Sequence, residues 1–233
     1  MTDSAPLVIL PFVQQKLPYS PLTEFAPIAV VARQTPVLVV GNKVPVKSVE
    51  ELVVYAKSNP GMSYGSAGTG SYFHIGMKQF RKMAGINLLN VPYKGTAPIM
   101  TDLLSGQIDM AIGTLGSMEQ YDRAGKLKIL AVTTDTRVSL RPDLPTIAES
   151  GFPEYRLPVW FGLVAPAKTH ASILDKIHSD IVEILKDKSF IERTLRAQSL
   201  LPGEETRTEF GSLLKTDSER WRNLVKDLNI PVE

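Results

Sequence analysis

The sequence predicts an α/β protein, because segments typical of strands alternate with segments typical of helices along most of its length. Two observations support this fold class. The continuous apolar runs are strand-sized, and several of the amphipathic segments between them begin or end with helix-capping residues. Such alternation predicts a mainly parallel sheet covered by helices on both faces, with ligands bound at the carboxyl ends of the strands.

The first two predicted strands are apolar runs at residues 25–32 and 37–40. Turn-forming residues at 17–21 precede them, and Gly41-Asn42 follows as a turn signal. The short connector at residues 33–36 is a candidate hinge between the two strands.

Capping patterns set the limits of several predicted helices. Ser48 and Glu51 have the spacing of a capping box, and Asn59-Pro60 ends the helix that they begin. Residues 137–158 are rich in proline and are expected to cross a surface without regular structure. The remaining predicted strands are 62–65, 89–93, 108–112, 127–132 and 160–166. Four of the remaining predicted helices span 96–105, 172–186, 189–197 and 206–228. Two others are predicted by their ends, one near residue 85 and one before residue 125.

Composition excludes several classes of function. The chain has 233 residues, 43% of them hydrophobic, and a net charge of +2 from dispersed basic residues, which disfavours a nucleic-acid partner. It has no cysteine, which excludes disulfides, thiolate metal sites and cysteine nucleophiles. Residues 1–6 lack the pattern of a signal peptide, and no apolar run approaches the roughly 20 residues of a membrane span.

Catalytic and metal-binding patterns are also missing from the sequence. There is no Gly-x-Ser-x-Gly motif, and the three histidines His74, His170 and His178 do not have the spacing of metal ligands. His74 is expected to pack in the fold or lie on its surface rather than act as a base. We therefore expect no catalytic residue, no metal and no cofactor.

The most informative segment is the glycine loop, residues 65–71, with the sequence Gly-Ser-Ala-Gly-Thr-Gly-Ser. Small side chains, hydroxyls and backbone N–H groups before a helix suit an anion such as a carboxylate or phosphate. Gly70 is not followed by the lysine of a phosphate-binding loop, and the glycine spacing does not fit a dinucleotide site. The alternative interpretation is a tight turn with a helix cap.

Two further loops follow predicted strands and are expected to face the same crevice. Lys94 and Gly95 precede a helix that begins at Thr96, where glycine lets the backbone approach a ligand. An exposed, solvated Lys94 is an equally good interpretation. Thr114 lies in a third loop, which an ordinary helix entry explains equally well.

The sequence resembles the Bug-type receptors of tripartite tricarboxylate transporters, which are periplasmic solute-binding proteins. The resemblance covers essentially the whole chain. It rests on segments 17–21, 25–28, 64–71, 91–98, 102–107, 124–127, 144–151 and 161–166.

This resemblance implies a type II periplasmic-binding-protein-like fold with two lobes and mainly parallel sheets. Residues 1–36 and 160–233 are expected to form lobe 1, and residues 37–159 lobe 2. It also implies a periplasmic location, no catalysis, and capture of a small carboxylate in a cleft between the lobes for membrane transporter subunits. The implied ligand-binding residues are Ser66, Ala67, Gly68, Gly70, Ser71, Lys94, Gly95, Thr114, Asp3 and Ser4.

One departure from the family pattern concerns the N-terminus. Family members have a signal peptide, a strand, a loop and a helix before the segment that matches residues 17–21, so the chain is expected to be N-terminally truncated with an incomplete first lobe. Asp3 and Ser4 are then expected in a loop at the cleft, and the exposed sheet edge favours a homodimer. The alternatives are a ligand-sensing module of a signalling system and a truncated form that does not bind; an acyl- or phosphoryl-transfer enzyme is disfavoured.

Overall fold

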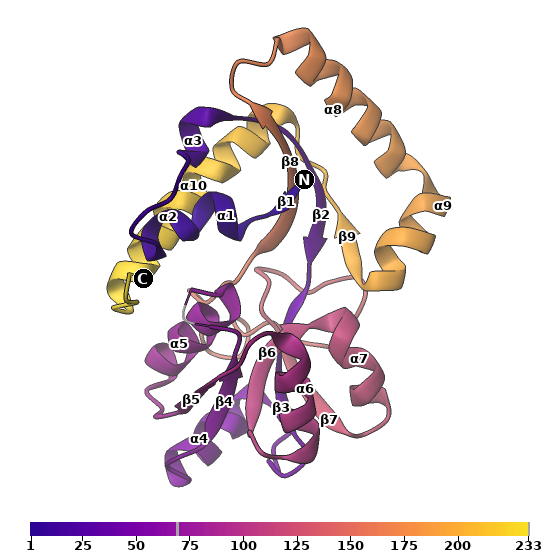
Figure 1. The fold of residues 1–233 in the computed structure, drawn as a ribbon. Helices are drawn as coiled ribbons and strands as arrows, with labels where there is room; N and C mark the ends of the chain where they lie inside the picture. Colours follow the sequence, from indigo (N-terminus) through magenta and orange to yellow (C-terminus); the bar gives the residue numbers. More distant parts are fainter. Residues whose placement is uncertain (69, 233) are drawn as a thin grey trace. The chain divides into compact units, whose positions relative to one another are not determined.

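The computed structural model describes residues 1–68 and 70–232, which divide into two compact units. Unit 1 comprises Met1–Gln34 and the chain from Val159 onward, and unit 2 comprises Thr35–Pro158 (Figure 1). In unit 2 the elements are β3 (Pro36–Gly41), α4 (Val49–Ser58), β4 (Ser63–Ser66), α5 (Tyr72–Ala84), β5 (Leu89–Pro92), α6 (Thr96–Ser105), β6 (Met110–Thr114), α7 (Leu115–Arg123) and β7 (Leu127–Val132).

The sheet of unit 2 has the strand order β5-β4-β6-β3-β7. The strands β5, β4 and β6 are parallel, while β3 is antiparallel to both β6 and β7, so four strands share one direction and only β3 is reversed. Val37 through Val40 in β3 are fully buried, as expected for a continuous apolar run in a central strand. The predicted mainly parallel sheet is confirmed for this unit.

Helices cover both faces of the unit 2 sheet. The Tyr64 ring lies beside His74 of α5, with ring centroids 6.1 Å apart, whereas a Cβ atom at Gly65 would be 2.8 Å from Ile99 of α6. Because consecutive residues of a strand point to opposite faces, α5 and α6 cover opposite faces of β4. A methyl group at Gly65 would clash with α6, so this glycine permits close packing of helix and strand.

His74 belongs to the buried face of α5, with only 5% of its surface exposed. Burial lowers the pKa of His74, the nearby charge of Lys78 lowers it further, and a side-chain hydrogen bond with Asn90 raises it, which leaves a pKa of about 4. The imidazole is therefore neutral at pH 7 and acts as a packed core residue, in agreement with the sequence-based expectation.

Unit 1 contains a sheet with the strand order β1-β8-β2-β9. All its strand pairs are antiparallel, so the prediction of mainly parallel sheets is wrong for this unit. The reason is that β2 and β8 pair directly with each other along nearly their whole length. The elements are β1 (Thr2–Asp3), α1 (Ala5–Val8), α2 (Leu10–Val13), α3 (Pro21–Glu24), β2 (Phe25–Gln34), β8 (Val159–Pro166), α8 (Ala171–Lys186), α9 (Lys188–Phe190), β9 (Leu200–Pro202) and α10 (Arg207–Asp227).

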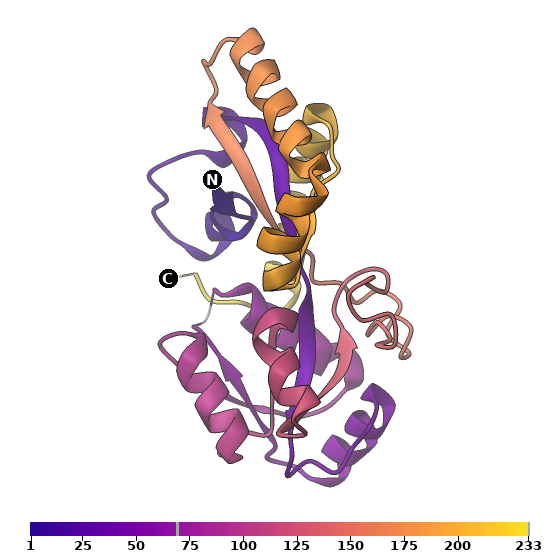
Figure 2. The same ribbon diagram turned by 90° about the vertical axis from the view of Figure 1, so that its right-hand side faces the viewer.

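The helices α8 and α10 cover opposite faces of the unit 1 sheet. Leu163 and Ala165 of β8 pack with α8, which lies along β2 and β8 in Figure 2. Trp160 of the same strand packs edge-on against Phe210 of α10, with ring centroids 5.2 Å apart. Odd-numbered residues of β8 thus contact α8, and Trp160, at an even position, contacts α10, because side chains of a strand point alternately to its two faces.

A buried hydrogen bond joins β8 to α10. The indole N–H of Trp160 donates to Oδ2 of Asp217 over 2.8 Å, and both residues are buried. Arg220 donates from Nε to Oδ1 of the same carboxylate over 3.4 Å. Asp217 therefore accepts the hydrogen bond of one of the two buried tryptophans in unit 1 and has a cationic partner of its own.

Three local expectations are wrong. Residues 1–5 do not form a loop throughout, because β1 pairs with β8 and α1 begins at Ala5. Residues 189–197 do not form one α-helix but end α9 and continue as a π-helical turn (Ile191–Leu195) and a 3₁₀ turn. The connector between β2 and β3 is reduced to Thr35, because Arg33 and Gln34 belong to β2.

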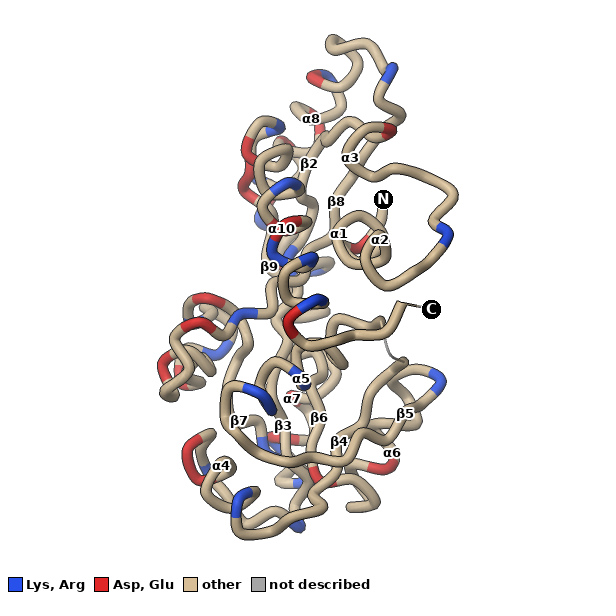
Figure 3. The backbone as a smooth tube through the Cα atoms, turned by 90° about the vertical axis from the view of Figure 1, so that its left-hand side faces the viewer, with Lys and Arg blue, Asp and Glu red and all other residues tan. Residues whose placement is uncertain are grey.

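Charged residues of both signs are interleaved along the chain in both units (Figure 3). The helix α10 illustrates this, since it carries both acidic and basic residues beside a buried, mainly apolar face. Among the described residues, none of the helices is both long and apolar enough to cross a membrane.

We expect Asp217→Ala to lower the free energy of unfolding by about 2 kcal/mol, because the substitution leaves the buried indole N–H of Trp160 without an acceptor. Urea unfolding followed by tryptophan fluorescence measures this, since both tryptophans of the chain, Trp160 and Trp221, lie in unit 1. Asp217→Asn keeps an acceptor and is expected to lose less than half as much. Equal losses for the two variants would contradict a role for the hydrogen bond.

We also expect acid to destabilise the protein through His74. The folded-state pKa of about 4 lies below the ordinary value of 6.5, so between these values the unfolded chain binds a proton that the folded chain does not. Stability is therefore complete above pH 6.5 and falls as the pH drops toward 4, by roughly 3 kcal/mol for this group alone. His74→Gln removes the titrating group. The free energy of unfolding of this variant, followed by far-UV circular dichroism, should therefore fall less between pH 7 and pH 4.5 than that of the wild type. An equal fall for both proteins would refute the assignment.

Candidate functional site

Three of the predicted loops lie at one edge of the unit 2 sheet. The strands β4, β5 and β6 are parallel, so their carboxyl ends meet at the same edge. The glycine loop follows β4, Lys94 and Gly95 follow β5, and Thr114 ends β6. The sequence-predicted residues of unit 2 therefore share this edge, and three helices, α5, α6 and α7, begin there.

The glycine loop has the geometry of a turn with a helix cap. The Ser71 hydroxyl donates to the Gly68 carbonyl over 2.9 Å and accepts from the His74 N–H over 3.3 Å. Gly68 has a φ of +98°, which favours glycine. Ala67 and Gly70 lie in the same loop and are partly exposed, while Thr69 lies outside the described residues. The Ser71 hydroxyl is thus engaged in capping α5.

Ser66 differs from its neighbours in having an unpaired hydroxyl. Its carbonyl accepts from the Tyr93 N–H over 2.8 Å, which fixes the end of β4 against the loop after β5. Its side chain is 1% exposed, and its Oγ has no hydrogen-bond partner among the described residues. A buried hydroxyl without a partner is costly, so among the described residues of the loop Ser66 gains most from a further hydrogen-bond partner.

The N-terminus of α6 is open. Gly95 is its N-cap and makes no side-chain capping bond, and its φ of +118° is a conformation that residues with a side chain rarely adopt. The first N–H groups of a helix have no partner within the helix, and the helix dipole places partial positive charge there. Lys94 is exposed.

At the end of β6, Thr114 caps α7. Its Oγ1 accepts from the Ser117 N–H over 3.3 Å and lies 2.9 Å from the Ser117 hydroxyl, which in turn donates to the Thr114 carbonyl over 3.0 Å. Thr114 is thus an ordinary N-cap residue, which was one of the two interpretations of its sequence context. It also lines a cavity.

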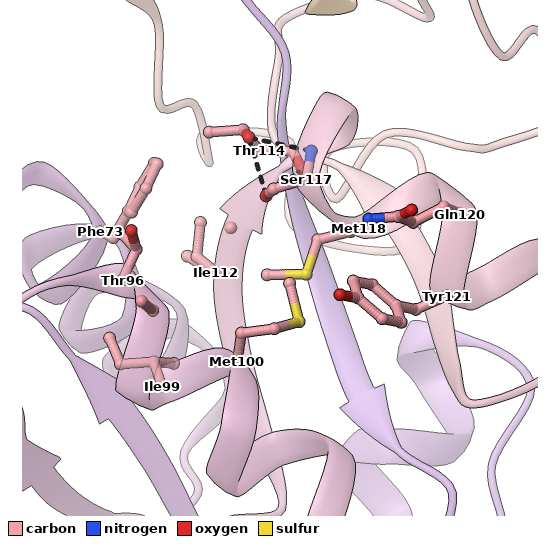
Figure 4. A pocket seen from close by; sticks show the side chains of 12 residues that line it. Phe73, Thr96, Ile99, Met100, Ile112, Thr114, Ser117, Met118, Gln120 and Tyr121 are labelled. Atoms are coloured by element: carbon pink, nitrogen blue, oxygen red, sulfur yellow. Dashed lines mark hydrogen bonds between the residues drawn. The ribbon is translucent and has the colours of Figure 1, made fainter.

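This cavity, which we name the α6–α7 cavity, lies within unit 2 and has a volume of about 300 Å³. Its walls come from the first turns of α6 and α7, from the end of β6 and from Phe73 of α5 (Figure 4). Thr96 and Ala97, at the open N-terminus of α6, are among its lining residues. The sequence identified Thr96 and Thr114 from their loops, but not the cavity.

The two predicted residues of unit 1 lie at the start of the chain. Asp3 Oδ1 accepts from the Ala5 N–H over 2.9 Å and so begins α1. Ser4 is buried, and its Oγ, like that of Ser66, has no partner among the described residues. Thr35 has the same property and was missed, because the sequence showed only a connector there. In the described part of the chain, no group of His, Asp and Glu could hold a metal ion.

Comparisons with known proteins identify the family. The description "Tripartite tricarboxylate transporter family receptor" (TctC) matches residues 1–230. Protein BugT of Bordetella pertussis is 29% identical over 227 residues, covering 97% of this chain and 69% of BugT. A UPF0065 protein from the tcbD-tcbE intergenic region of Pseudomonas sp. (strain P51) is 29% identical over 232 residues, covering 99% of this chain and 69% of that protein.

Solved structures confirm the fold class. R. palustris Rpa4515 with adipate is 31% identical, with a TM-score of 0.87 over 99% of this chain and 77% of that one. The periplasmic binding protein BugD is 30% identical, with a TM-score of 0.84 over 100% of this chain and 78% of that one. These matches confirm the type II periplasmic-binding-protein-like fold and the resemblance drawn from the sequence, and the chain belongs to the tripartite tricarboxylate transporter receptor family.

Proposed function

We propose that this chain is a periplasmic receptor that binds a small carboxylate and delivers it to the membrane subunits of a tripartite tricarboxylate-type transporter. The observation that carries the proposal is the buried hydroxyl of Ser66 at the carboxyl end of β4, which has no hydrogen-bond partner among the residues that the structure describes. A carboxylate oxygen is an acceptor that satisfies such a hydroxyl.

The neighbouring backbone supplies further donors. Ser66 is tied to the loop after β5 through the Tyr93 N–H, and α6 begins in that loop without a side-chain cap. Hydroxyl and N–H donors at a helix N-terminus favour an anion without an arginine or lysine in contact. The related Rpa4515 structure contains adipate, a dicarboxylate, which supports this class of ligand.

Binding without turnover is part of the proposal. The family to which the chain belongs consists of solute-binding receptors, and His74, the histidine closest to the glycine loop in sequence, is a buried and neutral core residue. We therefore assign Ser66 and the loop N–H groups to ligand capture rather than to catalysis.

We expect at least one carboxylate to raise the melting temperature of the purified chain, because a ligand that binds only the folded state stabilises it. A thermal-shift screen with citrate, succinate, adipate, glutamate, nicotinate and terephthalate measures this, followed by calorimetry of each hit. A folded chain that none of these carboxylates stabilises would argue against the proposal.

Ser66→Ala tests the residue that carries the proposal. The variant removes an unpaired buried hydroxyl, so its stability without ligand should be equal to or slightly above that of the wild type. Affinity for the carboxylate found in the screen should fall about tenfold, the usual cost of one hydrogen bond to a charged group. Ser105→Ala, on an exposed helix end, is the matched control with unchanged affinity; an unchanged affinity for Ser66→Ala would remove Ser66 from the site.

A further inference from the structure

The α6–α7 cavity is large enough for more than a carboxylate group. Its volume is about 300 Å³. A dry cavity of about 150 Å³ in another protein accommodates benzene, so this one has room for a ring or a short chain in addition to a carboxylate. It lies at the lower end of the range found for small-molecule sites.

The lining of the cavity is uncharged and mainly apolar. Its twelve lining residues include no Lys, Arg, His, Asp or Glu. The apolar ones include Phe73, Ile99, Met100, Ile112 and Met118. A charged group placed among these side chains would lose its hydration without gaining an ionic partner, whereas an apolar group would leave water favourably.

Two methionines make the cavity adaptable. In Figure 4 the side chains of Met100, from α6, and Met118, from α7, point toward each other, and the Tyr121 ring lies beside them. Thioether side chains are flexible and pack well against aromatic rings as well as alkyl chains. Gly113 makes room for this arrangement, since a Cβ atom there would be 2.0 Å from Met118 Cε.

The cavity borders the carboxyl edge of the sheet, and its polar lining residues lie both at that edge and on α7, where Gln120 and Tyr121 lie near Met118 (Figure 4). Thr96 and Ala97 begin α6, and Thr114 ends β6, so the carboxyl edge of the sheet borders the cavity. A ligand whose carboxylate lies at that edge would direct the rest of its body toward Met100 and Met118. Within one site, this places the carboxylate at the edge of the sheet and the body of the ligand beside the methionines.

We propose that the α6–α7 cavity receives the uncharged, apolar body of the ligand, so that the chain selects carboxylates with an alkyl chain of about six carbons or an aryl ring over hydroxylated ones. The proposal rests on the carboxylate binding proposed above and adds the part of the ligand that gives selectivity.

The test is calorimetry of the whole chain with butanoate, hexanoate, phenylacetate and gluconate. Gluconate has the chain length of hexanoate but carries hydroxyls on its body. Hexanoate is expected to bind about fifteenfold more tightly than butanoate, because each buried methylene contributes about a fourfold change in affinity. Phenylacetate should bind at least as tightly as hexanoate, and gluconate at least about tenfold more weakly.

Two variants separate the cavity from the carboxylate end. Gly113→Ala displaces the Met118 side chain, which lines the cavity, and Met100→Gln replaces a partly buried thioether by a polar group of similar length. Each should weaken hexanoate about fivefold and butanoate less than about twofold. Ser66→Ala should weaken both ligands by the same factor. Met83→Ala, a partly buried methionine of α5 outside the cavity lining, is the control with unchanged affinities.

The outcomes distinguish the two proposals. Equal affinities for butanoate, hexanoate and gluconate, or variants at Gly113 and Met100 that weaken butanoate as much as hexanoate, would overturn the role of the cavity and leave carboxylate binding intact. If none of the four ligands binds while another carboxylate of the thermal-shift screen does, the cavity proposal alone is overturned. If no carboxylate binds at all, both proposals fail. Should Gly113→Ala not fold, Met100→Gln decides the matter, because Met100 is only partly buried.

Discussion

The reversed strand β3 is the constraint on which the candidate site depends. Residues Val37–Val40 are fully buried and bond to β6 on one side and β7 on the other, both antiparallel. Because β3 begins beside Thr114, the chain enters unit 2 at the edge where β4, β5 and β6 end. The entry point, the glycine loop and the start of α6 therefore lie at one edge, and a strand of the opposite direction would have sent the chain to the far edge of the sheet.

At this edge, donors are supplied without a buried cation. Ser71 and Thr114 use their hydroxyls to cap α5 and α7, whereas the Ser66 hydroxyl has no partner among the described residues and the N-terminus of α6 has no side-chain cap. This division is physically reasonable, because a capped helix end and a ligand compete for the same N–H groups. The apolar α6–α7 cavity adjoins the uncapped helix, so the two proposals place recognition of the carboxylate and of the apolar body at the same element.

Unit 1 is organised by different forces. Its antiparallel sheet is held by the long pairing of β2 with β8, and its helices pack on opposite faces through the alternation of β8. The buried bond from Trp160 to Asp217 fixes α10 on one face. Ser4 has an unpaired buried hydroxyl in this unit, which parallels Ser66 in unit 2, although the two arise from different local structures: the start of a short helix and the end of a strand.

Local sequence patterns predict the positions of most strands and helices, the caps at Ser48 and Thr206, and the three loops after β4, β5 and β6, because these depend on local propensity, hydrophobic period and turn residues. The sequence also determined the family, through motifs spread over the chain. Three features are visible only in the tertiary structure: the sheet of unit 1 is antiparallel, the Ser66 hydroxyl is buried with no partner among the described residues whereas that of Ser71 is bonded, and Met100 and Met118 line a cavity. Strand direction, burial and cavity shape depend on contacts between residues far apart in the chain, and local patterns do not encode those contacts.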